Sequence, residues 1–438
     1  MVSPQKRIDI LNALRRGTVP QAGLDALAVG IERFSATVAD ELAQVARGGA
    51  MFKAIRGDYG CGKTFFVRWL QEQALAQGFV TAEIQISESE TPLHRLETVY
   101  RRLIERLRSS ECDQGAFRSI IDAWFFALEE DVLSGVSGKT TSPAELLTQT
   151  TELLEKRLAP VSRVAPAFAL ALRGYRAAVA ENNSTLADGL LAWIAGQPNV
   201  AADVKRNAGI KGEVDHFAAL GFLQGLLNVL RDSGRPGLVV VLDEVETLQR
   251  VRGDVREKAL NALRQLIDEI DAGRFPGLYL IITGTPAFFD GAQGVQRLPP
   301  LAQRLHVDFA TDPRFDNPRA AQIRLRGFDS ASLKEVGGKV RSIFIEGSAA
   351  KERVLARADD KTLERLADGL TGQLGGKVGV APRLFLKKLV SDVLDRIDQY
   401  PNFYPEKDYA LTLMPSEMTS VERAAAGFSS VDDIPLNV

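Results

Sequence analysis

The chain has 438 residues, of which 45% are hydrophobic and 25% are charged, and its formal net charge is −2. This length suits two or three globular domains, and the balanced charge excludes a strongly basic nucleic-acid-binding protein as a description of the whole chain. Two cysteines and three scattered histidines exclude a disulfide framework and a zinc site. No signal peptide or membrane-spanning apolar run is present, so we expect a cytoplasmic protein without membrane contact.

The first predicted elements are two helices, over residues 4–16 and 31–47. Gly17 ends the first helix, and residues 16–30 between the two helices are rich in turn-forming residues. We call residues 16–30 the connecting segment.

The next part of the chain carries the most informative pattern. Residues 57–64 read Gly-Asp-Tyr-Gly-Cys-Gly-Lys-Thr, which fits G-x-x-x-x-G-K-[ST], between a predicted strand over 50–55 and a predicted helix over 65–77. In this context backbone N–H groups and the helix N-terminus form a cradle for phosphates. We therefore predict that ATP binds here with Mg²⁺, with Lys63 at the β- and γ-phosphates and Thr64 on the metal. The predicted nucleotide contacts are Gly57, Asp58, Tyr59, Gly60, Cys61, Gly62, Lys63, Thr64 and Phe65. The connecting segment would pass over the base.

A buried parallel strand over 79–86 and a helix over 93–108 continue an α/β pattern. Residues 110–212 depart from it, because helical periodicity dominates and no strand is predicted. We interpret this stretch as a helical insertion. It would serve as a spacer or as a surface for a partner or regulator, and we favour the second.

A second acidic motif follows a helix predicted over 214–232. The strand over 237–244 contains four apolar residues and ends in Asp243-Glu244. Carboxylates at the carboxyl end of a central parallel strand face the crevice where open sheets bind ligands. We predict that Asp243 holds Mg²⁺, directly or through water, and that Glu244 positions and polarises the attacking water. This pairing favours ATP hydrolysis over binding alone.

The strand over 277–283, which follows a helix over 254–271, ends in Thr-Gly-Thr-Pro. A hydroxyl there, from Thr285 or Thr283, would lie beside the Asp243 strand and near the γ-phosphate, and we assign Thr285 to that role. The alternative is a simple strand-ending turn. Downstream, Arg304, preferred over Arg297, would reach the γ-phosphate of a neighbouring subunit in a homo-oligomer. A solvated or salt-bridged arginine is the alternative.

The last predicted strand of the sheet covers 321–325, and the pattern from 330 to 400 is helical. Arg383 falls in the first turn of one of these helices, where its charge opposes the helix dipole. This conflict indicates another task, such as contact with a phosphate, although a surface arginine remains the alternative. A further strand is predicted over 409–414, followed by a polar tail.

Strands that alternate with helices predict an α/β fold with a parallel sheet covered on both faces. We predict a nucleotide-binding α/β core over residues 1–328, with the helical insertion at about 110–212. A helical lid domain over 329–400 and a C-terminal tail over 401–438 would complete the chain.

With these residues in place, the chain resembles AAA+ P-loop ATPases of the origin-recognition and ExeA-like kind. Asp243-Glu244, Thr285 and Gly379-x-x-Pro382-Arg383 match the Walker B, sensor 1 and sensor 2 motifs of that class, and residues 57–64 match Walker A. Cys61 stands where Ser or Ala is more usual, and no clear winged-helix domain follows the lid.

More narrowly, the chain resembles the BrxD-type ATP-binding proteins of BREX bacteriophage-defence systems. The residues that carry this resemblance are 14–20, 28–30, 55–66, 79–80, 99–101, 241–244 and 284–286. The resemblance implies an ATP-dependent role beside a helicase, a methyltransferase or a phosphatase-like subunit, acting on DNA or on a DNA-processing partner. Two rival functions are a nucleotide-gated scaffold with little hydrolysis and an origin-recognition-like DNA-binding ATPase.

Overall fold

The computed structural model describes residues 2–135, 143–373, 382–418 and 423. Its centre is a five-stranded sheet in the order β2-β3-β4-β1-β5, and every pairing in it is parallel. The strands are β1 (Met51–Arg56), β2 (Val80–Gln85), β3 (Leu238–Asp243), β4 (Leu278–Gly284) and β5 (Gln322–Arg324). All five lie within or beside the predicted ranges, and the predicted α/β fold with a parallel sheet is confirmed. This arrangement is compatible with a P-loop nucleoside-triphosphatase core.

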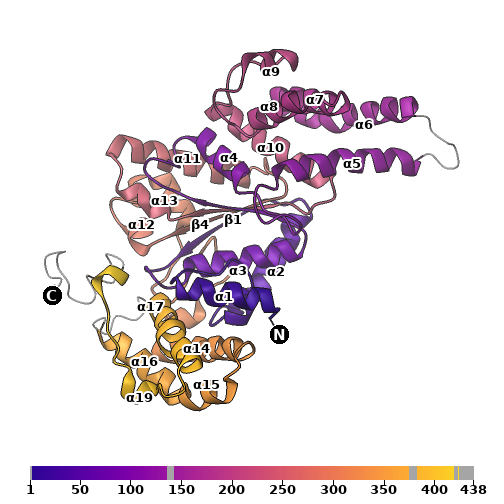
Figure 1. Cartoon of the computed structure of the whole chain (residues 1–438). Helices are drawn as coiled ribbons and strands as arrows, with labels where there is room; N and C mark the ends of the chain where they lie inside the picture. The colour runs from indigo at the N-terminus through magenta and orange to yellow at the C-terminus, as the bar shows by residue number, and fades with distance from the viewer. Residues whose placement is uncertain (1, 136–142, 374–381, 419–422, 424–438) are drawn as a thin grey trace.

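The two faces of the sheet are covered by different helices, which lie above and below the strands in Figure 1. One face packs on α2 (Glu32–Ala46) and α3 (Lys63–Ala76), and the other on α4 (Leu96–Glu105), α10 (His216–Asp232) and α11 (Gly253–Asp271). Alternate residues of β3 point to opposite faces of the sheet. Val239 and Val241 pack in the core with α2 and α3, and Val240 and Leu242 pack in the core with α4, α10 and α11. Burial on both faces explains the continuous apolar run of β3.

The insertion consists of helices packed on the α4–α10 side of the sheet. They are α5 (Phe117–Gly135), α6 (Pro143–Val164), α7 (Pro166–Ala180), α8 (Ser184–Ile194) and α9 (Ala202–Asn207). No strand occurs among the described residues of 110–212, as predicted. Phe222 of α10 joins the insertion to the core, because its ring lies 5.2 Å from Phe168 and 5.5 Å from Trp193. The ends of α5 and α6 extend together beyond the rest of the molecule (Figure 1).

A second group of helices, which we call the C-terminal bundle, follows β5. It comprises α14 (Ser330–Ile345), α15 (Lys351–Arg357), α16 (Asp360–Gln373), α17 (Pro382–Lys388), the π-helical turn η5 (Leu389–Leu394) and α18 (Asp395–Gln399). The helical prediction for 330–400 is confirmed over the described residues. The first helix of the chain, α1 (Pro4–Arg15), packs on this bundle through Ile10, Leu11 and Leu14. The predicted domain boundary at residue 328 stays a prediction.

The strand predicted over 409–414 is wrong, because these residues have no regular secondary structure. Tyr409, Leu411 and Leu413 pack against the C-terminal bundle, and they alternate with the exposed residues Ala410, Thr412 and Met414. An extended segment that lies on a helical surface shows the same alternation as a strand, but it has no neighbouring strand to pair with.

The remaining short elements are η1 (Leu24–Leu27), η2 (Val245–Gln249), α12 (Pro286–Asp290), η3 (Val295–Arg297), α13 (Pro299–Leu305), η4 (Pro313–Phe315), α19 (Pro405–Asp408) and η6 (Pro415–Glu417).

No helix in the described part of the chain is both long enough and apolar enough to cross a membrane.

Candidate functional site

The glycine-rich loop connects β1 to α3 in a tight turn. Gly60 and Gly62 have φ angles of 79° and 94°, in the left-handed region that glycine adopts without strain. Gly57 is required for a different reason, because a Cβ atom there would lie 2.3 Å from the Sγ atom of Cys61. Burial raises the pKa of the Cys61 thiol, which packs in the core beneath α3. The conformation of the loop therefore depends on close packing of the Gly57 backbone against the Cys61 side chain.

This packing leads to a prediction for Gly57→Ala. We expect the free energy of unfolding to fall by about 1–3 kcal/mol, because the added methyl group collides with Cys61. The double variant Gly57→Ala/Cys61→Ala should be more stable than Gly57→Ala alone, since the colliding sulfur is removed. Gly338→Ala is the matched control, because it lies in a helix with open space around it. Equal melting temperatures for Gly57→Ala and the wild type would contradict the collision.

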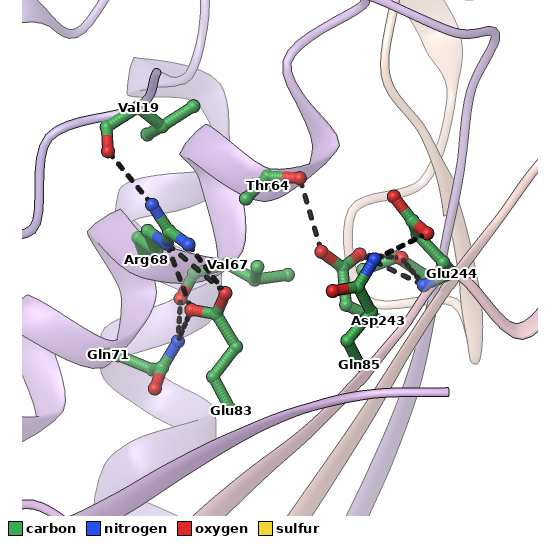
Figure 2. A network of polar contacts seen from close by, with 10 residues as sticks. Val19, Thr64, Val67, Arg68, Gln71, Glu83, Gln85, Asp243 and Glu244 are labelled. Atoms are coloured by element: carbon green, nitrogen blue, oxygen red, sulfur yellow. Dashed lines mark hydrogen bonds and ion pairs between the residues drawn. The ribbon is translucent and has the colours of Figure 1, made fainter. Parts of the chain in front are cut away.

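Lys63 and Thr64 begin α3 and point in different directions. The Nζ atom of Lys63 donates hydrogen bonds to the carbonyl oxygens of Gly57, at 2.9 Å, and Asp58, at 3.2 Å. It also lies 5.3 Å from the centre of the Tyr59 ring. The Oγ1 atom of Thr64 donates to Oδ2 of Asp243 at 3.2 Å (Figure 2). The loop and the end of β3 thus meet, as the sequence predicts.

Asp243 is fixed from two sides at the carboxyl end of β3. Besides the bond from Thr64, its Oδ1 atom accepts hydrogen bonds from the Thr283 hydroxyl and from the backbone N–H of Glu244. Burial raises the pKa of Asp243, and the hydrogen bond from Thr283 opposes that rise. A hydroxyl and one carboxylate beside a phosphate cradle match the way Mg²⁺ is held, with substrate phosphates and waters completing its shell. The described residues contain no cluster of three His, Cys, Asp or Glu side chains that could hold a metal alone.

Glu244 adopts an unusual backbone conformation next to Asp243. Its φ angle of 59° places a non-glycine residue in the left-handed region, which is typical of functional sites. Its Oε2 atom accepts a hydrogen bond of 2.8 Å from Nε2 of Gln85, at the end of β2 (Figure 2). Gln85 is a contact that sequence reasoning missed, although the parallel pairing of β2 with β3 places it beside Asp243.

Thr283 lies near the end of β4 and Thr285 just after it, and Thr283 is the one that contacts the acidic motif. Its hydroxyl also accepts a hydrogen bond of 3.1 Å from the backbone N–H of Glu244. Thr285, the residue assigned from the sequence, is the buried N-cap of α12 and makes no side-chain capping bond. The strand register gives the reason, because Leu242 pairs with Ile282 and so brings Asp243 beside Thr283. A role for Thr285 stays a prediction.

The three arginines considered from the sequence lie in two places. Arg304 pairs with Asp268 of α11, Nε to Oδ1, at 2.5 Å, and Arg297 is exposed in η3. Neither belongs to the lining of the cavity at the glycine-rich loop. Arg383 does line that cavity, and its Nη2 atom donates to the carbonyl oxygen of Glu417 at 2.8 Å. The glycine of its predicted motif lies outside the described residues.

A cavity of about 280 Å³, which we call the central cavity, brings most of these residues together. Its polar end contains Lys63, Thr64, Asp243 and Glu244, and it also contains Glu246, which the sequence analysis did not consider. Gly57, Asp58 and Cys61 do not line the cavity, whereas the remaining predicted loop contacts do. These are Tyr59, Gly60, Gly62 and Phe65.

The other walls of the central cavity are mostly apolar. They are formed by Leu14 of α1, by Val19, Pro20, Leu27 and Val29 of the connecting segment, by Phe328, and by Val336, Pro382 and Leu386 of the C-terminal bundle. The connecting segment is anchored to α3, since the Glu72 carboxylate accepts hydrogen bonds from the backbone N–H groups of Gly23 and Leu24 at 2.7 and 2.8 Å. A pocket with one polar end at the glycine-rich loop and mostly apolar walls suits a nucleotide.

One family model, described as BREX system ATP-binding protein BrxC/D, matches residues 2–413. No curated protein matches this sequence. The matched range includes every residue that lines the central cavity, from Leu14 to Leu386. The chain therefore belongs to the family of BREX system ATP-binding proteins BrxC/D.

Proposed function

We propose that this protein is an AAA+ ATPase that binds ATP with Mg²⁺ in the central cavity and hydrolyses it to ADP and phosphate. The observation that carries the proposal is the 3.2 Å hydrogen bond between Thr64 and Asp243, residues 179 positions apart. It joins a hydroxyl at the glycine-rich loop after β1 to a carboxylate at the end of β3, and β4 lies between these two strands in the sheet. The same two oxygen types are those that Mg²⁺ prefers.

Each group in the cavity has a distinct role in this proposal. Backbone N–H groups of residues 60–64 and the Lys63 ammonium bind the phosphates. Mg²⁺, held by Thr64 and Asp243, would neutralise charge on the β- and γ-phosphate oxygens. Glu244 orients the attacking water and accepts its proton, after leaving Gln85. Thr283 keeps the Asp243 carboxylate in place.

The apolar walls would hold the base, and the C-terminal bundle would act as a lid. Arg383 extends from that bundle into the central cavity, which supports a contact with the γ-phosphate when the lid closes. For Arg304 we keep the proposal that it serves a neighbouring subunit in a homo-oligomer, where it would first leave Asp268.

Membership of the BREX family supports a role in phage defence together with other BREX proteins, on DNA or on a DNA-processing partner. We place a partner contact on the projecting α5–α6 pair. Phe126 and Leu133 lie seven residues apart on one face of α5, and their exposed fractions are 61% and 52%. Large apolar side chains exposed on a projecting helix are typical of an interaction surface.

The proposal is tested by Thr64→Val, which removes the hydroxyl but keeps the shape of the side chain. We expect the Mg²⁺ concentration for half-maximal ATP hydrolysis to rise at least about tenfold, because one metal ligand is lost. Phosphate release by the purified full chain, measured across a Mg²⁺ titration, gives the result. Thr64→Ser keeps the hydroxyl and is the matched control. If Thr64→Val and the wild type needed the same Mg²⁺ concentration for half-maximal hydrolysis, the assigned metal site would be refuted.

A further inference from the structure

Glu246 is a carboxylate of the central cavity for which the proposed reaction has no role. Its exposed fraction is 5%, and neither Oε1 nor Oε2 has a hydrogen-bond partner among the described residues. Burying a carboxylate without hydrogen-bond donors costs free energy, so native proteins keep few such groups. The other carboxylates of the site differ, since Asp243 and Glu244 each accept hydrogen bonds.

The backbone at Glu244 explains how Glu246 comes to face the loop. After its left-handed turn the chain enters η2, and the side chain of Glu246 lines the cavity beside Tyr59 and Lys63. Burial raises the pKa of Glu246, the positive charge of Lys63 opposes that rise, and the negative charges of Glu244 and Asp243 add to it. No hydrogen bond or ion pair joins the two side chains, so Lys63 acts on Glu246 as a positive charge in the same cavity.

Lys63 is itself turned back toward its own loop. Its exposed fraction is 8%. Its ammonium donates hydrogen bonds to the carbonyl oxygens of Gly57 and Asp58 and lies near the Tyr59 ring. It also experiences the negative charge of Glu246. To bind the β- and γ-phosphates, the ammonium must exchange these contacts for phosphate oxygens. Phosphate and Glu246 therefore compete for one positive charge.

We propose that Glu246 acts through Lys63, as a negative charge that competes with phosphate in the central cavity, and thereby weakens the binding of nucleoside di- and triphosphates. When a phosphate takes the ammonium, Glu246 loses its counter-charge and faces further negative charge across a cavity of low polarity. The same penalty favours release of ADP after hydrolysis. This inference rests on the proposed ATP-binding function and names a residue that sets its affinity.

The test is Glu246→Gln, which removes the charge and keeps the shape. We expect the full chain to bind ATP about tenfold more tightly, measured by calorimetry, because the competing charge is gone. Binding of AMP should change less than twofold, since AMP lacks the phosphates that Lys63 contacts. A purely structural role would alter both ligands together. Glu257→Gln, at an exposed position of α11, is the matched control.

A second variant, Glu246→Met, removes the charge by an apolar side chain of similar length and keeps the test open if the glutamine variant does not fold. Unchanged or weaker ATP binding in a folded variant would overturn the inference while leaving ATP binding by the wild type intact. If the wild-type chain bound neither ATP nor ADP, the proposed function would fail as well.

Discussion

Lys63→Ala is expected to weaken ATP binding at least about 100-fold, equivalent to about 2.8 kcal/mol. The ammonium is the cationic side chain of the cradle, and charge-assisted hydrogen bonds to phosphate are among the strongest that a side chain makes. Calorimetric titration of the full chain with Mg²⁺-ATP measures the effect. Hydrolysis should be lost together with binding.

The loss should not reflect unfolding. Lys63 donates hydrogen bonds only to two carbonyl oxygens of its own loop, so its removal breaks no hydrogen bond between distant elements. We therefore expect a folded variant, with a modestly lower melting temperature because the buried Glu246 loses a nearby positive charge. Lys258→Ala is the control, because Lys258 is exposed on α11 and outside the central cavity. If folded Lys63→Ala bound ATP as tightly as the wild type, the glycine-rich loop would not be part of the ATP-binding site.

Glu244→Gln is expected to lower the rate of ATP hydrolysis by roughly 10²–10³-fold while ATP affinity stays within about threefold of the wild type. The amide keeps the shape of the side chain but cannot accept the proton of the attacking water. Phosphate release at saturating ATP, together with calorimetric binding, separates the two quantities. The hydrogen bond from Gln85 reaches only the side chain of Glu244, so the fold should be unaffected.

The comparison of the two variants in cells distinguishes an ATPase from a nucleotide-gated scaffold. An ATPase requires turnover, so both Glu244→Gln and Lys63→Ala should abolish defence against phage. A scaffold requires only bound ATP. Defence that survives Glu244→Gln but not Lys63→Ala would therefore contradict the ATPase proposal and support the scaffold.

The sheet was predictable because each of its strands has a strong local signal. The apolar run of β3 between a helix and an acidic pair, and the glycine-rich loop after β1, depend on neighbours in the sequence. The strand predicted over 409–414 failed because alternation reports one buried side and cannot say whether a strand or a helical surface covers it. A sheet requires a partner strand, and the local sequence does not contain that information.

The site was predictable to the same extent. The contact between Thr64 and Asp243 follows from two motifs with known positions on a parallel sheet. The position of Thr283 depends on the register between β3 and β4, which places Asp243 beside Thr283 and not beside Thr285, two residues further along the chain. Glu246 carries no sequence signal, because its place in the cavity follows from the left-handed backbone of Glu244.

The packing of α1 restricts how the protein can move. The connecting segment leaves the C-terminal bundle at α1, and its η1 turn contacts both α3 and α14 before the chain reaches α2 on the sheet. The chain passes between the same two bodies again after β5, at residues 325–330. A body attached through one linker can turn in any direction, whereas one attached through two separate linkers retains essentially one axis of rotation. If the bundle closes over a nucleotide as we propose, two linkers would leave that closure one main axis of rotation, and α1 would turn with the bundle.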